Sequence, residues 1–321
     1  MVVSGGILLL IPFLFALTIK QEQTFITTPE LFPVTVDPKN KLIVENAQVN
    51  AFLESPSSPL QAAVGSTGDT LWNIFAWVAT TIDGTSWYQN LAAVDGRFVT
   101  ITAGMRKEQV ASAFANVLSW SDQQKQEFMT PEASSSLPLI EGSFSPGVYL
   151  VNVGTTPQAA QTLVKARFTQ NILTHYGTAT AKIVPLNEAI TIASLIQRET
   201  IGTADMRLVS GIIWNRLFIN MNLQIDSTLQ YAKANEKRTG SWWPQIVSTD
   251  IYRRSPYNTY LNPGLPPTPI ANPSVAAVLA ALNPIKTSCL FYFNDQAGTI
   301  HCSDTYDEHV ALLKKYYGQG K

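Results

Sequence analysis

Residues 186–231 read LNEAITIASLIQRETIGTADMRLVSGIIWNRLFINMNLQIDSTLQY, and the rest of the chain is organised around them. The first third is apolar around almost the whole circumference of a helix, which predicts a buried helix beginning at Asn187. Glu199 follows Leu195 by four residues and Ile196 by three, so its carboxyl lies on the same face as the apolar stripe. A dry environment disfavours a carboxylate, raises its pKa and suits it to general acid catalysis. Glu199 is therefore the candidate acid, and the alternative from spacing alone is a helix-end glutamate turned toward solvent.

Composition excludes one large class of function. The chain has 321 residues, enough for one large or two ordinary domains. Charged residues make up only 14%, the net charge is −1, and there is no basic run. Nucleic acid is therefore excluded as a partner, because no surface would track its phosphates. A weakly charged surface rich in hydroxyl and amide groups suits a cell-surface protein that handles neutral ligands such as glycans.

The N-terminal segment predicts a membrane anchor. Residues 2–19 contain no charged side chain, and most of them are apolar. We interpret them as one transmembrane helix and not as a cleaved signal peptide, because no small-residue cleavage site follows. Lys20 follows the span, so positive charge does not define its orientation.

The remaining chain predicts an α+β protein with four further parts. Residues 20–60 are polar and proline-rich, which is typical of a linker or stalk. Residues 61–137 contain a strand, a glycine turn and a helix, which predict a compact α+β module ending in a polar break at 123–136. Residues 138–185 form a connector with a turn-rich strand segment and a helix at 157–176. Residues 186–321 form a mostly helical domain with a β-hairpin.

Within that last domain, helix-capping residues and prolines predict where the elements begin and end. Residues 206–218 form a helix capped by Thr203, and Asp226 caps a short helix that ends at Tyr231. Proline stops an alanine-rich helix after residue 282. The other expected elements are a surface insertion at 233–254, a proline-rich loop at 255–273, and a last amphipathic helix at 303–317.

Two cysteines, Cys289 and Cys302, flank the predicted hairpin. A tight turn between them would let the two side chains face each other. In an oxidising compartment they could form a disulfide, and two free buried thiols are equally compatible with the sequence.

Polar and aromatic side chains gather near Glu199 and in the proline-rich loop. Neutral hydrogen-bonding groups on a proline-stiffened loop predict a sugar-binding groove. The candidates are Asn215, Gln224, Asp226, Thr228, Tyr257, Asn258, Thr259 and Tyr260. Each has a structural alternative, as a helix cap for Asn215 and Asp226 or as a core residue for Tyr257 and Tyr260. The three histidines show no metal-ligand spacing, and no phosphate-binding or nucleophile-elbow motif occurs, so we expect neither metal nor cofactor.

Several segments, in this order, resemble the YceG-like endolytic murein transglycosylases (MltG). They are ASLIQRET, IIWNRL, NLQIDSTLQY, SPYNTYLNPGLPPTPIANP, AALNPIKT, LFYF and the DEH of the last helix. The resemblance is strong over residues 186–317 and weaker upstream, where VTITAGMRKEQVA and EGSFSPGVY are similar to the family's LysM-like module and connector. The chain departs from the family pattern in its 233–254 insertion and at a few positions: Gln197-Arg198 before the Glu-Thr pair, Ile225 and Ser227 in place of Thr and Pro, and Thr268 in place of Gly.

The resemblance implies a single-pass membrane protein whose extracytoplasmic domain cleaves nascent murein strands internally and leaves 1,6-anhydro ends. In the family's mechanism Glu199 is the only acid and base. We expect Gln224, Asp226, Thr228, Tyr257 and Asn258 to orient the sugars, and Glu141 to border the cleft. Murein glycan strands are the implied substrate, and peptidoglycan synthases are candidate partners. The alternatives are a two-carboxylate muramidase, which pairs Glu199 with Asp226 or Glu141, and a non-catalytic membrane-tethered glycan-binding protein.

Overall fold

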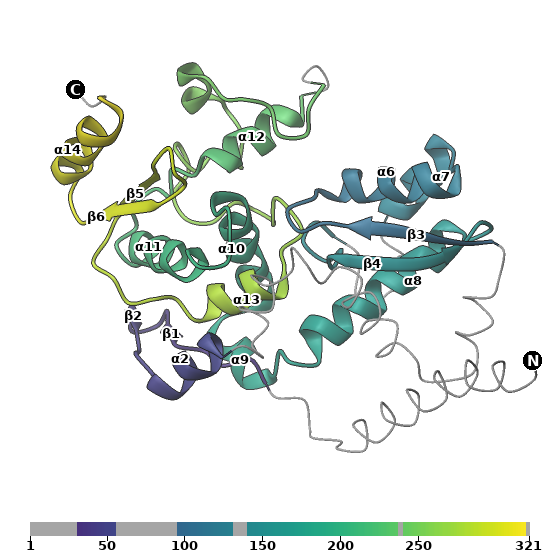
Figure 1. Ribbon diagram of the computed structural model, residues 1–321, viewed down its shortest axis with the longest axis horizontal. Coiled ribbons are helices and arrows are strands. Elements are labelled where there is room, and N and C mark those ends of the chain that lie inside the picture. Colours follow the sequence, from purple (N-terminus) through teal and green to yellow (C-terminus); the bar gives the residue numbers. More distant parts are fainter. Residues whose placement is uncertain (1–30, 56–94, 131–139, 237–239, 319–321) are drawn as a thin grey trace, which may run out of the picture.

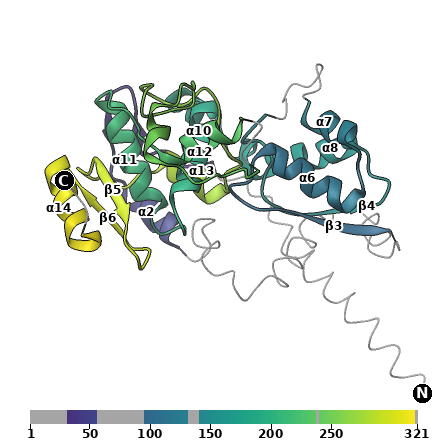
Figure 2. The same ribbon diagram turned by 90° about the horizontal axis from the view of Figure 1, so that it is seen from above.

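The computed structural model describes residues 31–55, 95–130, 140–236 and 240–318. These residues form two units with separate hydrophobic cores, which lie side by side along the long axis (Figures 1 and 2). The smaller unit is built on a two-stranded sheet and the larger on helices, so the α+β class is confirmed. The span expected at 2–19 lies outside the described residues. Within the described ranges, no helix combines the length and apolarity needed to cross a bilayer.

The smaller unit contains residues both from the expected module at 61–137 and from the expected connector at 138–185. Strand β3 (Gly96–Ile101) pairs antiparallel with β4 (Gly147–Asn152). Helices α6 (Lys107–Leu118), α7 (Asp122–Met129) and α8 (Pro157–Phe168) lie on one side of this sheet (Figure 2). One core joins side chains from both strands and all three helices. The boundary expected at 137/138 therefore runs through a single sheet, because β4 of the expected connector completes the expected module.

Helix α7 occupies the segment that we expected to be a polar break. Ser121 accepts a hydrogen bond from the N–H of Gln124, and the Gln124 side chain accepts one from the N–H of Ser121. This capping box starts the helix, and Phe128 anchors it against Phe114, with ring centroids 5.1 Å apart. A single fully buried anchor leaves almost no hydrophobic periodicity, which is why the pattern did not reveal the helix.

The described part of the expected stalk is folded onto the larger unit. Strands β1 (Val36–Asp37) and β2 (Leu42–Ile43) and helix α2 (Ala47–Glu54) contribute buried side chains to its core. The N–H of Thr35 donates to the carbonyl of Leu282 at 3.0 Å, and the Asn283 amide donates to the carbonyl of Pro33 at 2.8 Å. Residues 31–55 are thus part of the larger unit, which corrects the expectation of a linker at 20–60.

The larger unit is centred on α10 (Leu186–Glu199), which packs against α11 (Met206–Phe218) and α13 (Val275–Leu282). Helix α10 begins one residue before the predicted start, and every residue from 189 to 196 is buried, as its apolar circumference predicts. Helix α11 closely approaches the chain after α13. A Cβ at Gly211 would lie 2.3 Å from the carbonyl oxygen of Ile285, so the backbone contact requires glycine.

Several helix ends differ from the predicted ones. The residue before α11 is Asp205 and not Thr203, whose carbonyl instead accepts a bond from the N–H of Met206. Helix α12 (Asp226–Ala234) contains Asp226 as its first residue, follows Ile225 and extends beyond Tyr231. The helix expected at 157–176 is α8 followed by a π-helical turn (Thr169–Leu173), and α9 (Thr178–Ile183) then leads into α10.

The segment expected as a surface insertion folds back on itself. The carboxylate of Asp250, in a short 3₁₀ helix (Ser248–Tyr252), pairs with Lys233 at 2.7 Å and with Arg253 at 2.6 Å. The guanidinium carbon of Arg198 lies 3.9 Å from the ring centroid of Trp243, so the segment also packs against the end of α10. The loop at 255–273 has neither helix nor strand, as its prolines predict.

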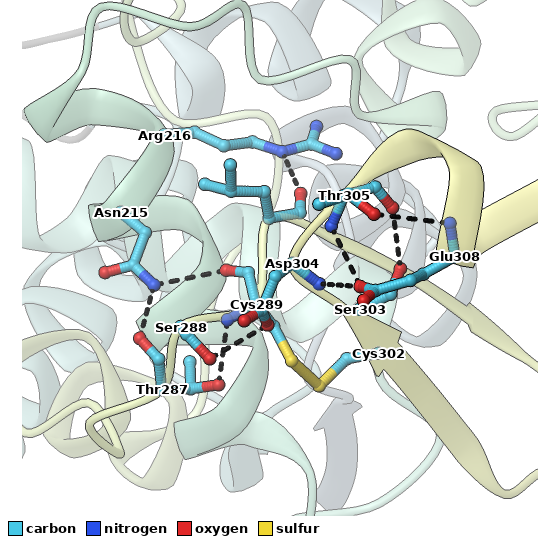
Figure 3. Close-up of a disulfide and its surroundings, with 11 residues drawn as sticks. Asn215, Arg216, Thr287, Ser288, Cys289, Cys302, Ser303, Asp304, Thr305 and Glu308 are labelled. Carbon is cyan, nitrogen blue, oxygen red and sulfur yellow. Dashed lines mark hydrogen bonds between the residues drawn. A yellow bond between two sulfur atoms is a disulfide. The ribbon is translucent and has the colours of Figure 1, made fainter.

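The hairpin and the last helix form the end of the larger unit (Figure 1). Strand β5 (Phe291–Asn294) pairs with β6 (Ile300–Ser303), and α14 (Tyr306–Tyr317) follows. The structure contains the Cys289–Cys302 disulfide, one of the two alternatives that the sequence left open (Figure 3).

Candidate active site

Glu199 is the last residue of α10, and its carboxyl group is held from two sides. Oε1 accepts hydrogen bonds from the Ser227 hydroxyl at 2.7 Å and the Ser227 N–H at 3.3 Å. Oε2 accepts one from the Tyr292 hydroxyl at 2.9 Å. Ser227 belongs to the first turn of α12 and Tyr292 to β5. The partly buried carboxyl therefore lies where three elements meet, and it does not turn away into solvent.

Opposing effects act on the pKa of Glu199. Burial raises it most, the hydrogen bonds from Ser227 and Tyr292 lower it, and the charge of Asp226 raises it again. The result is a pKa above the ordinary value for glutamate, so more of the group is protonated near neutral pH. The guanidinium groups of Arg198 and Arg216 also interact electrostatically with the Glu199 carboxylate. The site can thus hold a proton on Glu199 and also stabilise the carboxylate once that proton has left.

Arg216 fixes the geometry on the hairpin side. Its guanidinium donates to the carbonyl of Leu290 at 2.6 Å and also to the carbonyl of Leu223. These bonds join α11 to the chain before β5 and to the loop before α12. Burial and the Glu199 carboxylate raise the pKa of Tyr292 well above that of an ordinary tyrosine, so its hydroxyl remains a donor.

Asn215, next to Arg216 on α11, also binds the chain that leads into the hairpin. Its side-chain amide donates to the carbonyls of Thr287 and Cys289, at 2.7 and 3.1 Å (Figure 3). The disulfide links Cys289 to Cys302, which pairs with Tyr292 across the hairpin. Asn215 therefore has a structural contact that helps to position Tyr292.

Three of the expected sugar-binding residues have accessible side chains and lie at the start of α12 or in contact with it. Gln224 and Asp226 are exposed and Tyr260 is half-buried. The Tyr260 hydroxyl donates to Oδ1 of Asp226 at 2.5 Å. Gln224 has a φ of 49°, a left-handed backbone conformation that non-glycine residues seldom adopt, and its N–H donates to the carbonyl of Thr259. Asp226 and Tyr260 interact electrostatically with Glu199, and Gln224 lies two residues before the start of α12.

The other candidates in the loop are mainly buried. Thr228, Asn258 and Thr259 are 0%, 0% and 1% exposed. The hydroxyls of Thr228 and Thr259 are hydrogen-bonded to each other at 3.0 Å. The Asn258 amide donates to the carbonyls of Ile251 and Arg253, and its oxygen accepts from the N–H of Tyr260. These three side chains hold the loop in shape and present no free polar group to a ligand.

Tyr257 is intermediate between the accessible candidates and the buried ones. Its ring is half-buried against that of Tyr231, with centroids 4.8 Å apart. Its hydroxyl is hydrogen-bonded to that of Thr268 at 2.8 Å. Both contacts brace the proline-rich loop, so they match the alternative role in packing that its sequence position allowed.

Glu141 is buried at a different place, near the start of α6. Its Oε1 accepts from the N–H of Lys107 at 2.9 Å and from the amide of Asn272 at 3.2 Å. Burial, reinforced by the charge of Glu108, raises its pKa to about 8. None of these partners contacts Glu199, so Glu141 joins the smaller unit to the proline-rich loop.

Sequence reasoning missed the residues that contact the carboxyl group itself. Ser227 stood beside the candidate Asp226, and the alternation of β5 could have placed Tyr292 opposite Phe291 and Phe293. Neither feature of the sequence shows that Ser227 or Tyr292 would contact Glu199 in the folded chain. Among the described residues, no group of three or more His, Cys, Asp or Glu side chains could hold a metal ion.

Comparisons with known proteins identify the family to which this chain belongs. The model of the YceG-like family matches residues 77–315. A Bacillus subtilis (strain 168) endolytic murein transglycosylase is 30% identical over 241 residues, which cover 68% of this chain and 64% of that protein. An endolytic murein transglycosylase of Streptococcus pneumoniae (strain D39) is 31% identical over 171 residues. That match covers 53% of this chain but only 31% of the pneumococcal protein, so the chain spans about a third of its length.

The fold has a solved counterpart. The crystal structure of a yceG-like protein from Listeria monocytogenes superposes with a TM-score of 0.58 at 24% identity. The match covers 74% of this chain and 80% of that one. Because the family model spans more than half of the sequence and the solved fold agrees, this chain belongs to the YceG-like family.

Proposed function

We propose that this protein is an endolytic murein transglycosylase that uses Glu199 as its only acid and base. One observation carries the proposal: a partly buried carboxyl with a raised pKa is held by two neutral donors, Ser227 and Tyr292. The relatives named as endolytic murein transglycosylases support the substrate and the type of cleavage.

The reaction needs one proton to be given and then reclaimed. Protonated Glu199 donates to the oxygen between N-acetylmuramic acid and N-acetylglucosamine, and the bond from that oxygen to the muramic C1 breaks. The Glu199 carboxylate then takes the proton of the muramic C6 hydroxyl, whose oxygen bonds to C1. The 1,6-anhydro ring results, no water is consumed, and Glu199 is again protonated.

The contacts of Glu199 suit both halves of this cycle. Burial favours the protonated form that starts the reaction, and the donors on its two oxygens stabilise the carboxylate between the two proton transfers. We assign Gln224, Asp226 and Tyr260 to the sugar-facing side, because their side chains are accessible. Thr228, Asn258 and Thr259 hold the loop that presents them.

We also place residues 2–19 in the membrane and the catalytic unit on its outer side. The hydrophobic N-terminal segment and the murein substrate of the named relatives support this arrangement. Murein is assembled outside the cytoplasmic membrane, so a tethered enzyme would meet strands as they grow.

Product analysis tests the proposed reaction. The full chain is incubated with uncrosslinked murein strands, and mass spectrometry measures anhydro and reducing ends. We expect internal cuts with anhydro ends, and none with Glu199→Gln. Reducing muramic ends would instead support a muramidase that uses Asp226, whose charge acts on Glu199, as a second carboxylate. Unchanged cutting by Glu199→Gln would refute the assignment of the acid.

A further inference from the structure

A separate cavity of about 370 Å³ lies at the other end of α10 from Glu199. Four segments line it: the turn between β1 and β2, the first half of α10, the last half of α11 and the proline-rich loop. The lining includes Lys41, Glu188, Thr191, Trp214, Phe218 and Leu265. Its volume lies within the range of about 300–1,000 Å³ that is usual for ligand sites.

The cavity is distinct from the acid but connected to it. Glu188 and Glu199 are both on α10, and at a rise of 1.5 Å per residue their backbones are about 16 Å apart. The proline-rich loop also joins the two places, since Tyr260 contacts Asp226 and Leu265 lines the cavity. A ligand confined to the cavity cannot touch Glu199, so only a substrate long enough to span this separation could occupy both places.

The lining combines apolar rings with two opposite charges. Trp214, Phe218 and Leu265 supply apolar surface, while Lys41 supplies an ammonium and Glu188 a carboxylate. Within the described residues, neither charge forms an ion pair. A neutral sugar would displace water from both charges and neutralise neither. A ligand with a carboxylate and an amine would satisfy both and would bind in one orientation.

The turn that carries Lys41 is fixed before any ligand arrives. Asp37 accepts hydrogen bonds from the N–H and the side-chain amide of Asn40, at 3.0 and 2.7 Å. The N–H of Lys41 donates to the carbonyl of Pro38, and Lys41 itself has a left-handed φ of 54°. A turn closed in this way fixes the backbone of Lys41 at the rim of the cavity, so that binding would have to order only its side chain.

We propose that this cavity binds the zwitterionic peptide stem of murein, with Lys41 pairing with a carboxylate and Glu188 with the free amine of the peptide. The identity of the peptide rests on the proposed function. The glycan would then reach Glu199 while one of its peptides occupies the cavity. This arrangement would make the enzyme prefer strands that still carry peptides over bare glycan.

Two measurements on the full chain test the proposal. The first is calorimetric binding of the pentapeptide Nα-acetyl-l-Ala-γ-d-Glu-l-Lys-d-Ala-d-Ala, in which the blocked N-terminus replaces the amide link to the glycan and the lysine amine is the only free amine. We expect Lys41→Ala and Glu188→Gln each to weaken binding roughly tenfold, as the loss of a charge-assisted hydrogen bond does at a partly exposed site. The matched controls are Lys39→Ala, in the same turn, and Glu45→Gln, two residues after β2, which both change exposed charges outside the cavity. Acetylating the lysine amine of the peptide should remove the effect of Glu188→Gln.

The second measurement compares anhydro-end formation on peptide-bearing and peptide-free strands. We expect Lys41→Ala to lower the ratio of the two rates by roughly tenfold, and Lys39→Ala to leave it within twofold. Equal binding of the pentapeptide by the wild type and both cavity variants, or no binding by the wild type, would overturn the proposal. Failure of the proposed function is distinguishable, because it would abolish anhydro ends on both substrates and leave the binding measurement intact.

Discussion

The pH dependence of the reaction should move when either donor to Glu199 is removed. Tyr292→Phe removes the hydrogen bond to Oε2, and Ser227→Ala removes the hydroxyl bond to Oε1. Both donors favour the carboxylate, so without them the pKa of Glu199 rises further. The proposed reaction begins with protonated Glu199, so the alkaline limb of kcat/KM should shift to higher pH.

The size of the expected shift in the alkaline limb follows from the strength of a hydrogen bond to a charged acceptor, the Glu199 carboxylate. A hydrogen bond to a charged group contributes about 1.5–3 kcal/mol, and about 1.4 kcal/mol corresponds to one pKa unit. Because Glu199 is only partly buried, we take the lower end of that range. Each substitution should raise the limb by about one unit, and the double variant by about two, since the donors act on different oxygens.

The assay measures initial rates of anhydro-end formation between pH 5 and 9 at low substrate concentration. Tyr257→Phe is the matched control, because its hydroxyl contacts Thr268 and not Glu199. Circular dichroism and melting curves verify that each variant is folded. An alkaline limb that stays in place or moves to lower pH in both single variants would refute the reasoning, whatever their absolute rates.

Two further predictions concern stability. Replacing both Cys289 and Cys302 by serine should lower the free energy of unfolding by about 3 kcal/mol, since the disulfide closes a loop with a sequence separation of 13. Urea unfolding with and without reductant measures this difference, and equal midpoints for wild type and variant under oxidising conditions would contradict it. Glu141 has its pKa raised from 4.5 to about 8 by burial, so its contribution to stability is complete below its unfolded pKa and is lost as pH rises toward 8. Glu141→Gln should flatten this decline between pH 5 and 8, whereas the exposed Glu45→Gln should not. An identical decline in wild type and Glu141→Gln would show that the carboxyl is already ionised at pH 5.

The local hydrophobic pattern of the sequence was sufficient to predict the elements that bury a continuous face. The apolar circumference of residues 189–196 predicted α10, and the spacing of Glu199 from Leu195 and Ile196 put its carboxyl at the end of that stripe. Proline content predicted the irregular loop, and alternation about a turn predicted the hairpin. These features depend on the period of a helix or strand, which neighbouring residues already express.

Contacts between segments that are distant in the sequence could not be predicted from local patterns. Ser227 and Tyr292 are 28 and 93 residues from Glu199, and only the packing of α12 and β5 brings them to its two oxygens. The same holds for β4 completing the sheet with β3 across the expected boundary, and for Asn258, whose polar groups are all used inside the fold. Side-chain chemistry and period are local properties, so the sequence showed which residue could hold a proton. Which groups surround that proton depends on how helices and strands pack, and this is decided only when the chain is folded.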